Sequence, residues 1–439
     1  MDRQRLSPQC GPDVQRCVGD RRRRSPRTTA VVLFVVLAAL GLVSAGCSTG
    51  FGGGTDNNVA APAEDLAATE AADDPAADPE APSPVDPVPE LVAAMSQQEK
   101  VGQLLMPMVF GTGTTITAAE QQLNLDAHGY ATPAEIVSAY GLGGVIYLEA
   151  NIDSAPQLKG LSRQLQDAAL AGSGIGLLVA IDQEGGRVSR LSDEVTLFPP
   201  ASDLAGDPRL VRETSYITGQ QVQQQGINVV LAPVADVVEP GQVSFIGNRS
   251  FGSDPEVVAD MVAAAVDGLQ QSGVAAAVKH WPGHGATRVD SHNSLPTVDV
   301  DRALWDQRER VPFAAAIEED VAIVLVGHLA MPSLDGSALP ATVSPTLING
   351  LLRSELGFDG VVMSDALNMG AVGDIPRSDV VVESVLAGVD IVLIPPSLKE
   401  ASAGLNQAVE DGTISTEVLD QAVVRVLRLK QNLGLLPAR

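Results

Sequence analysis

The sequence is short of cysteine and of positive charge. Its 439 residues include 3 cysteines, Cys10, Cys17 and Cys47, and none lies beyond position 47. The rest of the chain therefore has neither a disulfide framework nor a cysteine-based metal site available to it. Lysine and arginine number 28 against 54 acidic residues, which gives a formal net charge of −26. Because nucleic-acid binding depends on cationic side chains that neutralise phosphates, this balance argues against a nucleic-acid partner.

Long apolar runs are also lacking, with one exception near the N-terminus. Val31–Val43 is an apolar run of 13 residues, whereas a helix needs about 20 to cross a bilayer. Arginines precede the run and small residues at 44–46 follow it, which is typical of a secretory signal peptide. The end of this segment resembles a bacterial lipobox. We therefore expect removal of residues 1–46, acylation of Cys47, and an extracytoplasmic protein anchored to the bacterial cell membrane by its N-terminal lipid; an uncleaved anchor helix is the alternative.

The stretch that follows has few residues that could form a core. Residues 47–89 are rich in alanine, proline, glycine and acidic residues, and no lysine or arginine occurs between Arg27 and Lys100. Such a composition buries too little apolar surface to fold, so it predicts a disordered acidic tether. The chain therefore divides into a signal peptide (1–46), a tether (47–89) and a folded domain (90–439).

From residue 90 onward, eight short and nearly continuous apolar runs recur. They are Gln103–Phe110, Gly143–Leu148, Gly176–Ile181, Ile227–Val234, Val274–Val278, Ala322–Val326, Gly360–Met363 and Asp390–Ile394. Runs of this length are typical of parallel strands covered on both faces. Helical patterns lie between them, such as those that begin at Pro255, run from Ser344 to Gly357, and run from Ser415 to Gly434. Eight alternating units predict an α/β fold, a (β/α)8 TIM-type barrel in a single catalytic domain. A doubly wound open sheet is the alternative, although no G-x-G-x-x-G motif follows the early strands.

Titratable residues stand at or near the ends of five of these runs. They are Asp182, Asp236, Lys279, His280, His328 and Asp365, while His284 and His292 lie in the loop after the fifth run. In a barrel of this kind, the active site lies at the carboxyl ends of the strands. The sequence therefore predicts a catalytic mouth built from these ends.

Three kinds of chemistry fit such a mouth. Metal-assisted hydrolysis would use His280 and His284, which are spaced like metal ligands on a helix, but the proline and glycines around them preclude a regular helix. Schiff-base chemistry would use Lys279, although nothing in the sequence indicates that its pKa is lowered. Glycoside cleavage needs a nucleophilic carboxylate and a proton donor on opposite sides of the bond. Asp365 could attack there, and a group in a loop could donate the proton.

Five motifs follow one another along the predicted domain. They are IDQEGGRV at 181–188, FIGNRSFG at 245–252, KHWPGHG at 279–285, DSH at 290–292 and SDALNM at 364–369. In this order, over roughly residues 91–439, they resemble glycoside hydrolase family 3. The third and fourth motifs resemble its NagZ-type β-N-acetylglucosaminidase (β-hexosaminidase) branch, here in a bacterial lipoprotein form.

The resemblance implies a role for each matching residue. Asp365 matches the nucleophile, His292 the general acid/base, and Asp290 the carboxylate that holds His292. A further set matches the residues that bind the sugar: Asp182, Arg190, Arg249, Lys279 and His280. The family retains the configuration of the anomeric carbon through a covalent glycosyl-enzyme, and neither a metal nor an organic cofactor is expected.

The residue types and their spacing agree with these roles. Asp365 ends a buried run, which would hold a nucleophile rigidly. Asp290 and His292 stand two apart in a loop, where a carboxylate–imidazole hydrogen bond can form and stabilise the imidazolium. Histidine titrates near neutral pH, which suits both the donation and the abstraction of a proton. A histidine in this role departs from the usual pair of glycosidase carboxylates.

Three neighbouring residues are predicted to have mainly structural roles. Glu184 is expected to bond the backbone of the sharp turn that Gly185 and Gly186 allow. His284 is expected either to organise the loop or to touch the substrate. His328 is expected to line the pocket.

Together these features predict a monomeric exo-β-N-acetylglucosaminidase. By resemblance, its substrates are terminal β-linked GlcNAc residues of peptidoglycan fragments (muropeptides) or chitooligosaccharides, and its role is in cell-wall turnover. Another activity of the family is the first alternative: a β-glucosidase, a β-xylosidase or a GlcNAc phosphorylase. The second is a non-catalytic, sugar-binding lipoprotein, and the presence of Asp365, Asp290 and His292 argues against it.

Overall fold

The computed structural model describes residues 86–113, 116–191, 195–241 and 243–437. The predicted signal peptide (1–46), the predicted lipidation at Cys47 and the predicted tether up to residue 85 lie outside the described residues. The end of the predicted tether needs correction, because helix α1 (Val88–Ala94) begins at Val88, whose side chain is fully buried. Among the described residues, no helix combines the length and the apolar character needed to span a membrane.

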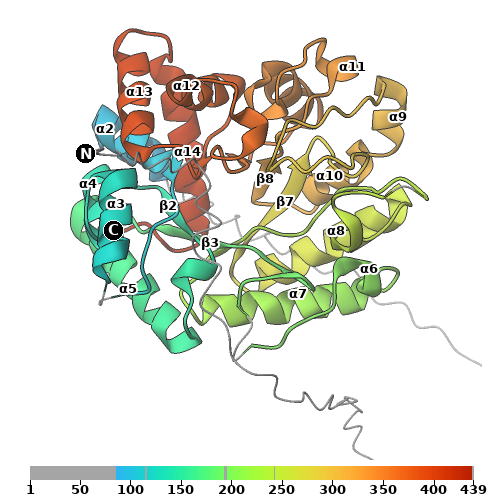
Figure 1. Cartoon of the computed structure of the whole chain (residues 1–439), viewed down its shortest axis with the longest axis horizontal. Helices are drawn as coiled ribbons and strands as arrows, with labels where there is room; N and C mark the ends of the chain where they lie inside the picture. The colour runs from blue at the N-terminus through green and yellow to red at the C-terminus, as the bar shows by residue number, and fades with distance from the viewer. Residues whose placement is uncertain (1–85, 114–115, 192–194, 242, 438–439) are drawn as a thin grey trace, which may run out of the picture. The chain divides into compact units, whose positions relative to one another are not determined.

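Parallel strands form a curled sheet with the helices arranged around it (Figure 1). Six strands follow the order β2 (Gly144–Tyr147), β3 (Leu178–Ile181), β6 (Val229–Val230), β7 (Ala275–Trp281), β8 (Ile323–Val326) and β9 (Val361–Ser364). Strand β1 (Leu105–Met106) pairs in parallel with β10 (Val392–Leu393). Single parallel bridges join Met108 to Ile146 in β2, and Met363 in β9 to Ile391. The fold is thus α/β, and each of the eight predicted runs overlaps one of these strands.

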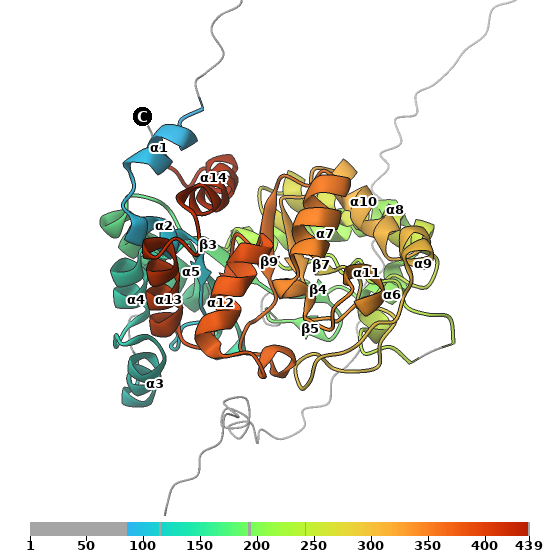
Figure 2. The ribbon, with the colours of Figure 1, turned by 90° about the horizontal axis from the view of Figure 1, so that it is seen from above.

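Helices connect the successive strands and pack on their neighbours. They are α2 (Gln97–Gln103), α3 (Ala118–His128), α4 (Pro133–Tyr140), α5 (Ala155–Gly172), α6 (Ala201–Leu204), α7 (Pro208–Gln223), α8 (Pro255–Gln271), α9 (Arg302–Gln307), α10 (Arg310–Glu318), α11 (Pro332–Asp335), α12 (Arg377–Ala387), α13 (Leu398–Glu410) and α14 (Thr416–Asn432). Four 3₁₀ turns are η1 (Glu149–Asn151), η2 (Gly247–Arg249), η3 (Ala341–Val343) and η5 (Gly370–Val372). Helix α7 packs on α8, α8 on α10, and α12 on α13. Helix α14 lies beside α1 and α2 (Figure 2).

The predicted helices form, with one difference. Asp254 caps α8 by accepting the backbone N–H groups of Glu256 and Val257, and Ser415 caps α14. The predicted helix after Ser344 is instead a π-helical segment, η4 (Thr346–Glu355), in which Leu356 donates its N–H to the carbonyl of Leu351. Its apolar residues are buried as expected, and a sequence pattern does not separate an α-helical turn from this wider one.

Successive residues of a strand point to opposite faces of the sheet. Both sets are apolar here, so both faces of the sheet are apolar. One set, which includes Ile146, Leu178, Ala277, Leu325 and Met363, forms an inner cluster. The residues that alternate with it pack beneath the helices in a second, larger cluster. This arrangement explains why the strands read as continuous apolar runs.

Several predicted strand boundaries are wrong, and two of them affect the description of the site or its neighbours. Gln103 is the last residue of α2, so the first strand is shorter than its apolar run. Strand β7 continues to Trp281, so Lys279 and His280 lie within the strand rather than after it. Lys279 pairs with Leu325 and Trp281 with Val326 of β8. Polar side chains ended the apolar run at Val278, while the backbone pairing continued beyond it.

Candidate active site

The predicted site residues gather at the carboxyl ends of the parallel strands. Asp182 directly follows β3 and Asp365 directly follows β9. Lys279 and His280 stand in the last part of β7. Since parallel strands end at the same edge of a sheet, this placement brings distant segments of the chain together.

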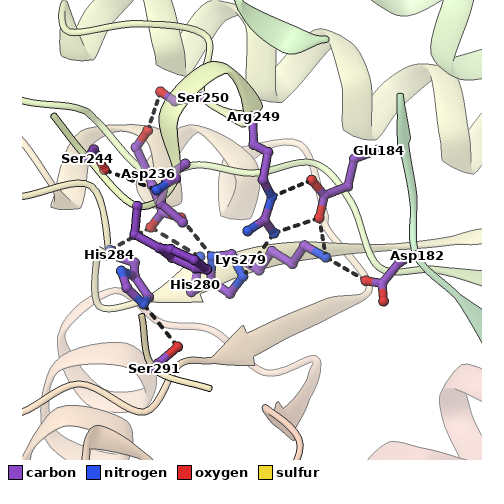
Figure 3. A network of polar contacts seen from close by, with 12 residues as sticks. Asp182, Glu184, Asp236, Ser244, Arg249, Ser250, Lys279, His280, His284 and Ser291 are labelled. Atoms are coloured by element: carbon purple, nitrogen blue, oxygen red, sulfur yellow. Dashed lines mark hydrogen bonds and ion pairs between the residues drawn. The ribbon is translucent and has the colours of Figure 1, made fainter. Parts of the chain in front are cut away.

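A buried ion-pair network links the ends of β3 and β7 (Figure 3). The Nζ of Lys279 lies 2.8 Å from Oδ1 of Asp182 and 2.7 Å from Oε1 of Glu184. Glu184 also accepts two hydrogen bonds of 2.7 Å from the guanidinium of Arg249. The expectation that Glu184 bonds the backbone is therefore wrong: its partners are two cationic side chains, in the fork geometry that arginine and carboxylate favour.

The charges of this network are kept ionised by their neighbours. Burial would raise the pKa of Glu184, but the charges of Lys279 and Arg249 outweigh it and lower the pKa from 4.5 to about 2. Burial also opposes ionisation of Asp182, yet Lys279 holds the pKa of this carboxyl below its usual value. Burial acts to lower the pKa of Lys279, and the two carboxylates raise it. The network therefore presents fixed charges at neutral pH.

A short hairpin carries Glu184 and Arg190 into the site. It consists of β4 (Gln183–Gly185) and β5 (Val188–Ser189), which pair in an antiparallel manner. Gly185 and Gly186 have φ angles of 95° and 55°, so the sharp turn predicted from them is confirmed. Arg190 lies 2.9 Å from Glu149 and 3.5 Å from Asp182, measured between its guanidinium nitrogens and their carboxylate oxygens.

A second buried pair, Asp236 with His280, lies beside this network. The Nδ1 of His280 is 2.7 Å from Oδ2 of Asp236, whose Oδ1 accepts the backbone N–H of His284 at 2.6 Å. Burial would raise the pKa of Asp236, but the nearby imidazole of His280 and these hydrogen bonds lower it. The Nε2 of His280 lies 3.5 Å from the guanidinium of Arg249. Because a guanidinium only donates hydrogen bonds, Nε2 is the acceptor and the proton of His280 lies on Nδ1, toward Asp236.

The predicted hydrogen bond between Asp290 and His292 is present. The Nδ1 of His292 is 2.7 Å from Oδ1 of Asp290, which also accepts the backbone N–H of His292 at 2.9 Å. Asn293 donates to the other carboxylate oxygen at 2.9 Å. The side chain of His292 is 50 % exposed, so the ring is open to solvent.

Asp365 is held by backbone contacts at the end of β9. Its N–H donates to the carbonyl of Val326, and its Oδ1 accepts the N–H of Ala366, both at 2.8 Å. Burial would raise the pKa of Asp365, but the imidazoles of His328 and His280 and the Ala366 N–H lower it. Asp365 is therefore an ionised carboxylate with a fixed backbone, as a nucleophile requires.

His328 is hydrogen-bonded to this segment. It is fully buried, with Nδ1 2.6 Å from Oγ1 of Thr342 and Nε2 3.0 Å from the carbonyl oxygen of Ala366. Both ring nitrogens are thus engaged by the protein. Burial lowers the pKa of His328, so the ring is neutral at neutral pH. It was expected to line the pocket, but it is buried and instead holds the backbone next to Asp365 through the carbonyl of Ala366.

The loop that carries His292 is joined to the loop that carries Asp365. Gly370 donates its N–H to the carbonyl of His292 at 2.9 Å, and Ala371 donates to the carbonyl of Ser291 at 3.2 Å. A Cβ at Gly370 would lie 2.5 Å from the carbonyl oxygen of Asn293, so only glycine permits this approach. The two loops therefore place an ionised carboxylate and a carboxylate–imidazole pair at one edge of the sheet.

Sequence reasoning missed two contributors to the site. Asp236 was recognised as a residue at a strand end but received no role, and Glu184 received the wrong partners. The signal available was the high density of titratable residues at run ends. Among the described residues, no group of three or more His, Cys, Asp or Glu side chains has the geometry to hold a metal ion.

Comparison with known proteins gives a consistent picture. Residues 96–429 match the model of the glycosyl hydrolase family 3 N-terminal domain. The chain is 36 % identical over 324 residues to β-hexosaminidase LpqI of Mycobacterium tuberculosis, covering 71 % of this chain and 81 % of that protein. It is 35 % identical over 329 residues to β-hexosaminidase A of Pseudoalteromonas piscicida, covering 68 % of this chain and 55 % of that protein.

The structure is similar to a glycoside hydrolase family 3 β-N-acetylglucosaminidase from Paenibacillus sp. str. FPU-7, with a TM-score of 0.72, 39 % identity, and coverage of 79 % of this chain and 64 % of that one. The chain thus spans little more than half of one relative and less than two thirds of another.

Proposed function

The chain belongs to glycoside hydrolase family 3, and from this we propose that it is a retaining exo-β-N-acetylglucosaminidase. The observation that carries the proposal is the junction of two loops, in which hydrogen bonds from Gly370 and Ala371 hold the Asp290–His292 pair next to the Asp365 segment. The names of the β-hexosaminidase relatives support the choice of sugar.

In the proposed mechanism, Asp365 attacks the anomeric carbon while His292 donates the proton on Nε2 to the departing oxygen. Asp290 stabilises the imidazolium form of His292 before this transfer by accepting the hydrogen bond from Nδ1. The products of this step are the released aglycone and a glycosyl ester on Asp365. The transfer leaves His292 neutral, so in the second step it acts as a base: it takes a proton from the attacking water and becomes an imidazolium again. Water then displaces Asp365, and two inversions retain the configuration.

The sugar is proposed to bind over the buried charges. Asp182 and the Nε2 of His280 are acceptors for sugar hydroxyl protons, while Lys279, Arg190 and Arg249 are donors. Hydrogen bonds to charged groups are stronger than those between neutral groups, so this set suits a ligand rich in hydroxyl groups. Terminal β-linked GlcNAc of muropeptides or chitooligosaccharides is the proposed ligand.

We also propose that the curled sheet is a complete (β/α)8 barrel forming a single catalytic domain. The β1–β10 ladder and the bridges Met108–Ile146 and Met363–Ile391 support closure between β9 and β2. The inner apolar cluster, with one set of alternate side chains from each strand, supports a filled interior.

The N-terminal segment supports a cellular context for the proposed enzyme. A signal peptide, acylation of Cys47 and an acidic tether would hold a monomeric catalytic domain outside the cell membrane, where it would act in peptidoglycan turnover. Replacing Cys47 by alanine should release the protein from membranes, because the tether then lacks an apolar anchor. Fractionation of cells tests this, and a wild-type protein in the soluble fraction would contradict it.

Product analysis tests the proposed activity. Defined GlcNAc–MurNAc fragments are incubated with the enzyme, and the products are identified by mass spectrometry. Free GlcNAc released from the non-reducing end is the expected product. Fragments that stay intact would contradict the proposal, and GlcNAc-1-phosphate as the main product in phosphate buffer would identify a phosphorylase instead.

A further inference from the structure

We propose that His284 and Ser291 are positioning residues that hold the His292 loop in place relative to Asp365. This inference rests on the proposed function, because it concerns the proton transfer that His292 performs there. The side chains of His284 and Ser291 are buried, with exposed fractions of 1 % and 2 %, and they contact each other.

The link is a direct side-chain contact beneath the loop. The Nε2 of His284 lies 3.1 Å from Oγ of Ser291 (Figure 3). Ser291 stands between Asp290 and His292 in the sequence, so whatever fixes Ser291 also fixes both members of the pair. The carbonyl of Ser291 meanwhile accepts the N–H of Ala371, in the loop after β9. Ser291 is therefore tied by its side chain to one segment of the site and by its backbone to another.

His284 is itself fastened to the sugar-binding side of the site. Its backbone N–H donates to Oδ1 of Asp236 at 2.6 Å, and the other oxygen of Asp236 holds His280. A continuous path of polar contacts thus runs from His280 through Asp236 and His284 to Ser291. Through this path, the loop is positioned against the same groups that would hold the sugar.

The protonation state of His284 suits a permanent contact. Its Nδ1 is buried and has no hydrogen-bond partner within the described part of the chain. A neutral imidazole can leave a lone pair there and place its single proton on Nε2, where it donates to the hydroxyl of Ser291. Burial lowers the pKa of His284 to about 4, so the ring stays neutral near pH 7.

An aromatic ring completes the support. The ring of Phe245 lies 5.7 Å from that of His284 and 6.0 Å from that of His292, measured between centroids. The N–H of Phe245 donates to the carbonyl of Thr287 at 3.0 Å, so its own loop is joined to the His292 loop. His292 is thus half exposed, and the Phe245 ring lies beside both its ring and that of His284.

The test is the dependence of kcat/KM on the leaving group. A dinitrophenolate leaves without a proton, whereas a sugar or alkyl alkoxide needs the proton of His292. A misplaced acid therefore slows cleavage of a GlcNAc disaccharide and spares the dinitrophenyl glycoside. For Ser291→Ala we expect kcat/KM to fall about 10- to 100-fold on the disaccharide, as for a displacement of about 1 Å, with little change on the dinitrophenyl glycoside. Because kcat/KM includes only the steps up to the first irreversible one, hydrolysis of the glycosyl-enzyme does not affect the comparison.

Matched variants separate positioning from loss of structure. Ser294→Ala alters an exposed serine in the same loop that makes no side-chain bond among the described residues, and it should behave as wild type. His284→Gln keeps an N–H donor near the place of Nε2 and should retain more disaccharide activity than His284→Phe. Equal losses on both substrates, or no loss on either, would overturn the inference while leaving the proposed function intact. A wild-type enzyme that cleaves neither substrate would overturn both.

Discussion

The buried charges at the ends of β3 and β7 and the loop that carries His292 are stabilised in different ways. The side chains of Lys279, Glu184 and Arg249 are 4 %, 5 % and 11 % exposed, and ion pairs between distant segments hold them. The side chains of His292 and Asp290 are 50 % and 33 % exposed, and hydrogen bonds between loops hold their backbone. The first region is a fixed set of charges, as a binding surface requires. The second leaves an imidazole open to solvent, as repeated proton transfer requires.

Replacing the proposed nucleophile should have the largest effect. Asp365→Asn removes the oxygen anion that forms the glycosyl ester, so we expect kcat to fall on the order of 10⁴-fold. Steady-state kinetics measure this, with Asp374→Asn, an exposed aspartate further along the same segment, as the control. Rates close to wild type, after exclusion of contaminating enzyme, would remove Asp365 from the mechanism.

The exposed region should lose activity without losing stability. Asp290→Asn keeps the shape of the side chain but removes the charge that stabilises protonated His292, so we expect kcat to fall about 10²- to 10³-fold. The free energy of unfolding should change by less than about 1 kcal/mol, because the pair is exposed. Kinetics and chemical denaturation of one preparation measure both. A large loss of stability would show that the loop is structurally coupled to the core.

The buried region should show the opposite pattern. Glu184→Gln leaves Lys279 and Arg249 with one buried anion fewer between them, so we expect a loss of about 3 kcal/mol in the free energy of unfolding and a raised KM. Glu149→Gln is the matched control: it breaks the ion pair of Arg190 with a carboxylate that is 77 % exposed, and should cost less than about 1 kcal/mol. Equal losses in the free energy of unfolding for the two variants would contradict the distinction between the two regions.

The decrease of the free energy of unfolding at acidic pH should also depend on Glu184. Its pKa is about 2 in the folded protein and 4.5 in an ordinary carboxyl, so the unfolded chain binds the proton more readily. The contribution of Glu184 to stability is therefore complete above pH 4.5 and is lost as the pH falls from 4.5 toward 2. Denaturation at several pH values measures this. As the pH falls over this range, the free energy of unfolding should decline less steeply in Glu184→Gln than in the wild type. Identical slopes in variant and wild type would contradict the assigned pKa.

The sequence reveals the elements of the site better than their pairing. Asp182 and Asp365 could be placed because each follows a buried apolar run, and the hydrogen bond of Asp290 to His292 is local enough to predict from a spacing of two. Glu184 and Arg249 are 65 residues apart, and Asp236 and His280 are 44 apart. Such pairs depend on which strands lie side by side, and periodicity carries no information about that. The end of β7 was misplaced for a related reason: hydropathy records the polarity of side chains, and Lys279 and His280 are polar although they are buried and lie in the strand.

The most direct test of the account is to trap the glycosyl-enzyme. An activated fluorinated glycoside of GlcNAc that slows the second step is incubated with the protein, and the intact mass and the proteolytic peptides are measured by mass spectrometry. The account predicts one added glycosyl group, located on Asp365 and absent from Asp365→Asn. An enzyme that turns over normal substrate but carries the label on another residue, or never carries it, would contradict the assignment of Asp365 as the nucleophile.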